Sequence, residues 1–257
     1  MTGANTVVNK KNTEHSLNIG GSYQMQLHGD ISSTDAQQIG ALLSEWNNAM
    51  NRHDADTVAN THTYQAMIRG TEYSVAEYRV KVAKAFSKHP DFQQSPANEV
   101  YATPLADKSG YAIIFDETFT QGGKSTPTEI MLVVIREGVN YKIIYESDIS
   151  TDRNLLKKMG INATAWASPS DCMQLMGQIL IESPVFRYEY IRQNKAFAKS
   201  KSLNIGCDEE ECIVYDKGKP EQHYEFDFKS MKMTEIVFDY KTGIHPKYSS
   251  QISRLCQ

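Results

Sequence analysis

Hydrophobic residues first recur at helical spacing, one every three or four positions, between residues 35 and 88. The run Ser33-Thr34-Asp35 offers N-cap side chains, and the apolar positions after it predict a helix over about 35–52. These positions are Ile39, Leu42, Leu43, Trp46, Ala49 and Met50. Asp54 is then placed to cap a second, short helix through Ala59.

A strand and a third helix follow. Tyr64, Ala66 and Ile68 alternate with more polar positions, as in a strand, and Gly70 marks the turn after them. Ser74 has the capping-box spacing with Glu77 and predicts the start of a helix. Its apolar face consists of Val75, Tyr78, Val82 and Phe86.

Beyond Pro90 the period changes from helical to two, which is typical of strands. Four strands are predicted, at 97–107, 110–121, 128–138 and 141–149, with hairpin turns at Gly122-Gly123 and Glu137-Gly138. The third of them is apolar on both faces. Ile130, Leu132 and Val134 face one way, whereas Met131, Val133 and Ile135 face the other. One face fills the core, so the other needs a cover from a second copy or from the C-terminal part of the chain.

The elements predict an α+β protein of two parts. Residues 1–32 form a polar N-terminal tail with one short strand at 22–29, and residues 33–152 form three helices followed by a curved antiparallel sheet. After a linker at 153–167, residues 168–257 form a smaller domain with one helix and a small antiparallel sheet.

Composition excludes several classes of function. Of the 257 residues 40% are hydrophobic, which is ordinary for a globular protein. The net charge of −4 argues against binding to the phosphate backbone of a nucleic acid. No apolar run approaches the roughly 20 residues that a membrane-spanning helix needs. The polar start, MTGANTVVNKKNTEHS, has no signal-peptide core, so we expect a cytoplasmic protein. If a signal has been removed, a periplasmic or secreted protein is the alternative.

Four cysteines lie in the C-terminal half: Cys172, Cys207, Cys212 and Cys256. We expect free thiols, and the spacing of CDEEEC does not match zinc or thioredoxin-like sites. The alternative is a disulfide between Cys207 and Cys212 across a short hairpin, which would indicate an oxidising compartment.

The segment WNNAMNRHDADTVA, followed by a strand, a helix that opens SVAEY, and long strands that end YKIIYESDIS, resembles the nuclear transport factor 2-like superfamily. The resemblance covers about residues 33–152. It implies a cone, in which the bent sheet wraps around the helices and leaves a pocket at its wide end. It also implies that a homodimer forms through the outer face of the sheet.

Members of this superfamily that act as ketosteroid isomerases carry an Asp base after the second helix. Here the corresponding segment, NTHTYQAMIRG, holds His62 and Tyr64 but no carboxylate before Glu72. His62, Tyr64, Asp116 and Tyr145 are the remaining candidates for acid–base chemistry. The aromatic residues expected to line the pocket are Trp46, Tyr64, Tyr78, Phe115 and Tyr145.

The chain has no H-x-x-x-H or H-E-x-x-H pair, no phosphate-binding glycine loop and no G-x-S-x-G elbow, so no metal or cofactor is expected. The missing base favours a binding protein, which takes a small apolar ligand in the cone or a protein partner on the open sheet face. The alternatives are an isomerase, dehydratase or cyclase, and a dimerisation or interaction module.

Overall fold

The computed structural model describes residues 13–18, 24–105, 107–158, 171–188, 203–207, 211–216, 219–227, 232–235 and 240–256. A curved eight-stranded sheet forms its centre, in the order β1-β2-β5-β6-β7-β8-β3-β4. Neighbouring strands are antiparallel except for the parallel pairs β2–β5 and β3–β8. The strands are β1 (Thr13–Asn18), β2 (Gln24–Gly29), β3 (His62–Ile68), β4 (Thr71–Ser74), β5 (Gln93–Pro104), β6 (Gly110–Gln121), β7 (Lys124–Glu137) and β8 (Asn140–Asp148).

Strand β2 corresponds to the short strand expected at 22–29, whereas β1 was not expected within the polar tail. The two strands pair with each other, and β2 pairs with β5 at the edge of the central strands. Leu27 of β2 is fully buried in the core. The side chains of β1 are mostly polar and show no alternation that would predict a strand. Backbone hydrogen bonds to β2 hold the segment in the sheet instead.

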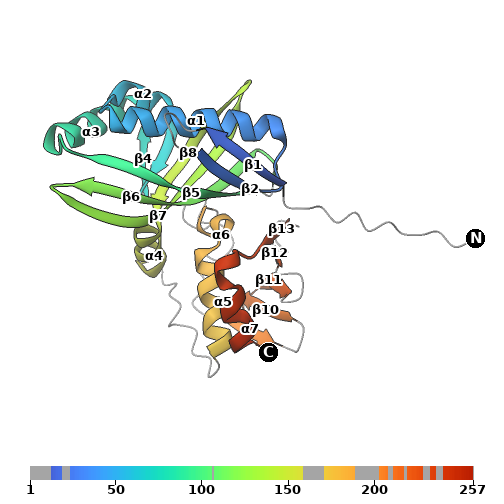
Figure 1. Cartoon of the computed structure of the whole chain (residues 1–257). Coiled ribbons are helices and arrows are strands. Elements are labelled where there is room, and N and C mark those ends of the chain that lie inside the picture. The colour runs from blue at the N-terminus through green and yellow to red at the C-terminus, as the bar shows by residue number, and fades with distance from the viewer. Residues whose placement is uncertain are drawn as a thin grey trace, which may run out of the picture.

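Three helices lie over one face of the sheet: α1 (Ser33–Asn51), α2 (Ala55–Asn60) and α3 (Val75–Lys88) (Figure 1). Each begins at a side-chain cap, formed by Ser32, Asp54 and Ser74, and Ser74 with Glu77 makes a complete capping box. The apolar face of α1 packs on β5–β8 in one hydrophobic cluster. A second cluster joins α2 and α3 to β3.

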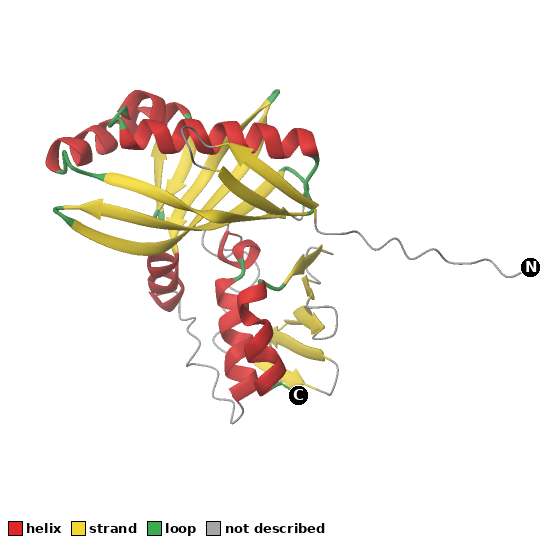
Figure 2. Ribbon diagram, in the orientation of Figure 1, coloured by secondary structure: helices red, strands yellow, loops and turns green. Residues whose placement is uncertain are grey.

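The C-terminal part of the chain lies against the opposite face of the sheet (Figure 2). It contains the helices α4 (Ile149–Lys158), α5 (Asp171–Glu182), α6 (Pro184–Tyr188) and α7 (Ser249–Leu255), with a 3-10 turn η3 (Pro246–Tyr248). A five-stranded antiparallel sheet accompanies them, in the order β13-β12-β11-β10-β9. Its strands are β9 (Leu203–Cys207), β10 (Glu211–Asp216), β11 (Lys219–Asp227), β12 (Lys232–Glu235) and β13 (Tyr240–Gly243).

This C-terminal part supplies the cover that the outer face of the sheet needs. Met131 and Val133 are fully buried on that face, in a cluster with Met176 and Ile179 of α5 and Ile252 of α7. The covered area is therefore not available to a second copy of the chain.

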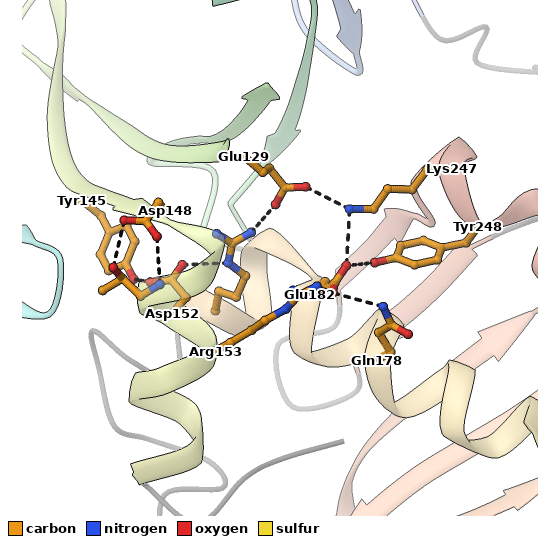
Figure 3. Close-up of polar contacts among 11 residues, drawn as sticks. Glu129, Tyr145, Asp148, Asp152, Arg153, Gln178, Glu182, Lys247 and Tyr248 are labelled. Carbon is orange, nitrogen blue, oxygen red and sulfur yellow. Dashed lines mark hydrogen bonds and ion pairs between the residues drawn. The ribbon is translucent and has the colours of Figure 1, made fainter. Parts of the chain in front are cut away.

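A network of buried charges accompanies this packing (Figure 3). Arg187 of α6 is fully buried and donates to Asp152 Oδ2 and Glu129 Oε1, each at 2.8 Å. Lys247 reaches the other oxygen of Glu129 at 2.9 Å and pairs with Glu182 at 3.3 Å. Burial opposes the ionisation of Glu129, but the charges of Arg187 and Lys247 hold its pKa below the usual value.

A disulfide between Cys172 and Cys256 corrects the expectation of free thiols for these two residues. It links the start of α5 to the residue that follows α7. Cys207 and Cys212 are backbone partners on β9 and β10, and their side chains lie outside what the structure describes.

The disulfide closes a loop of 84 residues, so its loss should destabilise the protein by about 2–4 kcal/mol, mainly through the unfolded chain. Urea unfolding of Cys172→Ser/Cys256→Ser against the wild type measures this difference. Peptide mapping without reductant should recover the Cys172–Cys256 linkage. Equal unfolding midpoints for the two proteins would contradict a stabilising bond.

Candidate functional site

A cavity of about 530 Å³ opens between the helix-covered face of the sheet and α3. Its volume lies within the usual range for small-molecule sites. Aromatic and aliphatic side chains form most of the wall: Trp46, Met50, Ile68, Tyr78, Val82, Ala85, Phe86, Phe92, Phe119 and Ile130. The remaining lining residues are polar or charged: Arg69, Lys81, His89, Gln94, Gln121, Lys124, Thr126, Glu146 and Ser147.

Because β6 alternates regularly, three of its side chains point to the helix-covered face of the sheet. Phe115 belongs to the cluster under α1, Phe119 lines the cavity, and Glu117 lies between them on the same face. Asp116 is exposed on the other face. Of the two adjacent carboxylates, Glu117 is therefore the inward one, and Asp116 as a site candidate is wrong.

Strand β8 does not alternate regularly, and this decides which of its residues reach the cavity. Val134 of β7 pairs with Ile143, whereas the next residue, Val133, pairs with Tyr145, so Ile144 is an extra residue in β8. The bulge reverses the two faces beyond it. Glu146 therefore lines the cavity, while Tyr145 turns to the outer face.

Glu146 is the centre of a buried hydrogen-bonded group. Its Oε2 accepts a bond from the Tyr78 hydroxyl at 3.1 Å and lies 3.0 Å from His62 Nε2. His62 Nδ1 lies 2.9 Å from the carbonyl oxygen of Val58. Both ring nitrogens of His62 thus lie within hydrogen-bonding distance of oxygen atoms, and the tautomer of the ring decides which nitrogen donates.

The surroundings of Glu146 favour its charged form. Burial raises its pKa, but the hydrogen bond and charge of His62, together with Arg69 and Tyr78, outweigh burial and lower the pKa below the usual value. In turn, burial and the Glu146 carboxylate raise the pKa of Tyr78 well above its usual value. Tyr78 therefore stays a neutral hydrogen-bond donor.

Glu117 has the opposite environment. Its side chain is 1% exposed, and neither carboxyl oxygen has a hydrogen-bond partner in the described ranges. Burial and the charge of Glu146 raise the pKa of Glu117 well above its usual value. Glu146, which lines the cavity, and Glu117, which lies outside its wall, therefore have oppositely shifted pKa values.

The residues expected from the sequence do not all meet at this site. Trp46 and Tyr78 line the cavity, and Phe115 packs edge-on against Trp46 within the core. His62 lies behind Glu146 and contacts the site through it. Tyr64 is 78% exposed, because the pairing of β3 with β8 is irregular between His62 and Met67.

Tyr145, which was expected to line the cavity, lies on the outer face of the sheet. Its hydroxyl donates to Asp152 Oδ1 at 2.6 Å. The sequence prediction named Asp116 as a candidate rather than its neighbour Glu117, and it did not include Glu146. The alternation that pairs Glu117 with Phe115 was a usable signal for Glu117, whereas nothing in the sequence of β8 marks the bulge that turns Glu146 inward.

Two further findings concern metal binding and membrane-spanning helices. Within the described ranges, no group of three or more His, Cys, Asp or Glu residues is arranged to hold a metal ion. No helix in the described part of the chain is long and apolar enough to cross a membrane.

The raised pKa of Glu117 predicts a pH-dependent loss of stability. In the unfolded chain the carboxyl ionises near its usual pKa of 4.5, whereas the folded protein resists that ionisation. Stability therefore falls as the pH rises above about 4.5, up to the folded pKa. Glu117→Gln should remove this loss and be more stable than the wild type at pH 8, with little difference at pH 4.

Denaturant unfolding at both pH values tests this expectation. Asp116→Asn, which neutralises the adjacent exposed carboxylate, is the matched control and should change stability little at either pH. A Glu117→Gln variant that is less stable than the wild type at pH 8 would show that the carboxylate is charged and paired.

Comparison with known proteins gives similarities to solved structures and none to a family model or a curated protein. Among solved structures, Bd1075 from Bdellovibrio bacteriovorus matches with 11% identity and a TM-score of 0.39, over 47% of this chain and 45% of that one. The match therefore spans less than half of Bd1075.

Two smaller proteins are covered almost completely. An NTF-2-like protein of unknown function from Shewanella oneidensis MR-1 matches at 13% identity and a TM-score of 0.34, over 43% of this chain and 95% of that one. A putative aromatic ring hydroxylase from Novosphingobium aromaticivorans matches at 16% identity and a TM-score of 0.42, over 46% and 90%. These three matches each cover less than half of this chain.

Proposed function

We propose that the protein binds a small, largely apolar molecule in the cavity beneath α3. The observation that carries this proposal is an open, mostly apolar cavity with a few polar side chains in its wall, among them Glu146 and Gln94. Such a combination of hydrophobic walls with a few polar groups is typical of ligand sites.

The polar atoms near the inner wall indicate what the ligand carries. Trp46 and Gln94 line the cavity, and Trp46 Nε1 and Gln94 Oε1 are buried without a hydrogen-bond partner in the part of the chain described. Leaving such groups unsatisfied costs about 1–3 kcal/mol each. A hydroxyl or carbonyl group on the ligand would satisfy them, so the ligand combines an apolar body with at least one hydrogen-bonding group.

A bulky residue at the cavity wall should block binding. Ala85 lines the cavity from an exposed position on α3, so Ala85→Trp fills space without entering the core. We expect the neutral fluorophore N-phenyl-1-naphthylamine to bind the wild type with enhanced emission, and Ala85→Trp to weaken its binding at least tenfold.

Ala83→Trp is the matched control, because Ala83 is exposed on the same helix and does not line the cavity. It should bind the fluorophore like the wild type. No binding to the wild type, or equal binding to both variants, would contradict the proposed site.

A second candidate function is general acid–base catalysis, and the oppositely shifted pKa values of Glu117 and Glu146 favour it. The Glu146 carboxylate would take a proton from carbon, whereas protonated Glu117 lies outside the cavity wall and would have to turn inward to donate to a developing oxyanion. Binding ranks first because the lowered pKa makes Glu146 a weak base and because His62 and Tyr78 already occupy its Oε2.

Deuterium exchange into 2-tetralone, a small bicyclic ketone, tests the catalytic candidate. If Glu146 is a base, the wild type accelerates exchange at the carbons beside the carbonyl, and Glu146→Gln removes about a hundredfold or more of the acceleration. Exchange is followed by proton NMR, with circular dichroism to verify folding. Glu137→Gln, at an exposed hairpin position, is the control. No acceleration by the wild type would leave binding as the function of the cavity.

The C-terminal part of the chain bears on three related proposals. The Cys172–Cys256 disulfide supports an oxidising compartment, and hence a periplasmic or secreted protein rather than the cytoplasmic one expected from the sequence. The C-terminal part occupies outer-sheet surface that a homodimer or protein partner would otherwise use. The boundary at residues 153–167 stays a prediction, since residues 159–170 lie outside the described ranges.

A further inference from the structure

The charged residues along the cavity are not evenly distributed. Glu146 is the acidic residue among those that line it, and its side chain is only 12% exposed. Three cationic residues also line the cavity: Arg69, Lys81 and Lys124. All three are exposed residues, so they lie where the cavity meets solvent.

Two of these cations have no acidic partner in the described part of the chain. Arg69 pairs with Asp148 at 3.4 Å, so its charge is partly compensated. Lys81 instead contacts a neutral phenol, donating to the Tyr73 hydroxyl at 2.7 Å. For Lys124, no ion pair is formed within the described ranges. Lys81 and Lys124 therefore bring positive charge to the mouth that no ion pair within the described ranges neutralises, although the Asp91 carboxylate accepts from the Gly122 backbone nitrogen at the turn before Lys124.

The two lysines approach the cavity from different elements. Lys81 is on α3, and Lys124 begins β7 directly after the Gly122-Gly123 turn. In Figure 1, α3 and the turn between β6 and β7 lie at the same end of the sheet, with α3 above the turn. A ligand that enters from this end passes between α3, which carries Lys81, and the start of β7, which carries Lys124.

We propose that the ligand is an amphipathic anion, such as an aromatic or aliphatic carboxylic acid, with its negative group at the mouth beside Lys81 and Lys124. This inference rests on the proposed binding function. The orientation follows from charge, because a negative group placed inside would face the Glu146 carboxylate in a region of low dielectric. With the anion at the mouth, the apolar body contacts the aromatic wall, including Trp46, Phe86 and Phe119.

A pair of fluorophores with one skeleton and different charge tests the proposal. 8-Anilinonaphthalene-1-sulfonate is N-phenyl-1-naphthylamine with an added sulfonate. We expect Lys81→Gln/Lys124→Gln to weaken binding of the sulfonate roughly fivefold to tenfold, and to change binding of the neutral amine less than twofold. Raising the salt concentration to 0.5 M should weaken the sulfonate selectively, because both lysines are exposed.

Lys84→Gln/Lys88→Gln is the matched control. It removes the same charge from exposed positions on α3 that do not line the cavity, and both fluorophores should bind it as they bind the wild type. Equal weakening of the sulfonate by both double variants would reduce the effect to net charge and overturn the inference.

Failure of this inference can be distinguished from failure of the binding function. If the neutral amine binds and Ala85→Trp blocks it, but Lys81→Gln/Lys124→Gln leaves the sulfonate unaffected, the anionic ligand is excluded and the cavity remains a binding site. If neither fluorophore binds the wild type, the proposed binding function fails, and the inference fails with it.

Discussion

A single extra residue in β8 determines what each face of the central sheet can do. Ile144 interrupts the alternation, so that Tyr145 and Glu146 point to faces opposite to those a regular strand would give them. Glu146 can then bind His62 and Tyr78 beside the cavity. Tyr145 can reach Asp152 on the other side. The carboxylate of the candidate site and the anchor of the C-terminal part are thus neighbours in sequence, and one bulge separates their environments.

The C-terminal part is held to the sheet by apolar packing and by charges that balance one another. Arg187 is fully buried, and its cost of desolvation is offset only because Asp152 and Glu129 both lie within hydrogen-bonding distance. An isolated buried pair gives weak net stability, but its geometry permits few alternatives. We infer that the network mainly fixes where α6 sits, whereas the cluster around Met131 and Met176 supplies the stabilising free energy.

Much of the central fold was predictable from the sequence because its signals are local. The Ser74–Glu77 capping box, the Asp54 cap and the period-two pattern of β6 and β7 each depend on residues close together in the chain. The site depended on features that are not local. The bulge in β8 and the irregular pairing of β3, which exposes Tyr64, arise from the register between strands far apart in sequence. The disulfide likewise joins cysteines 84 residues apart, whose spacing carries no signature.

The cavity lies at the boundary between two separately packed hydrophobic clusters. Trp46 and Ile130 belong to the cluster under α1, whereas Tyr78, Val82 and Phe86 belong to the cluster formed by α2, α3 and β3. Its width is set by how closely the two clusters approach. Substitutions on α3 can therefore change that width and leave the packing of α1 on the sheet intact, so the size of the cavity can change during evolution while the core is kept.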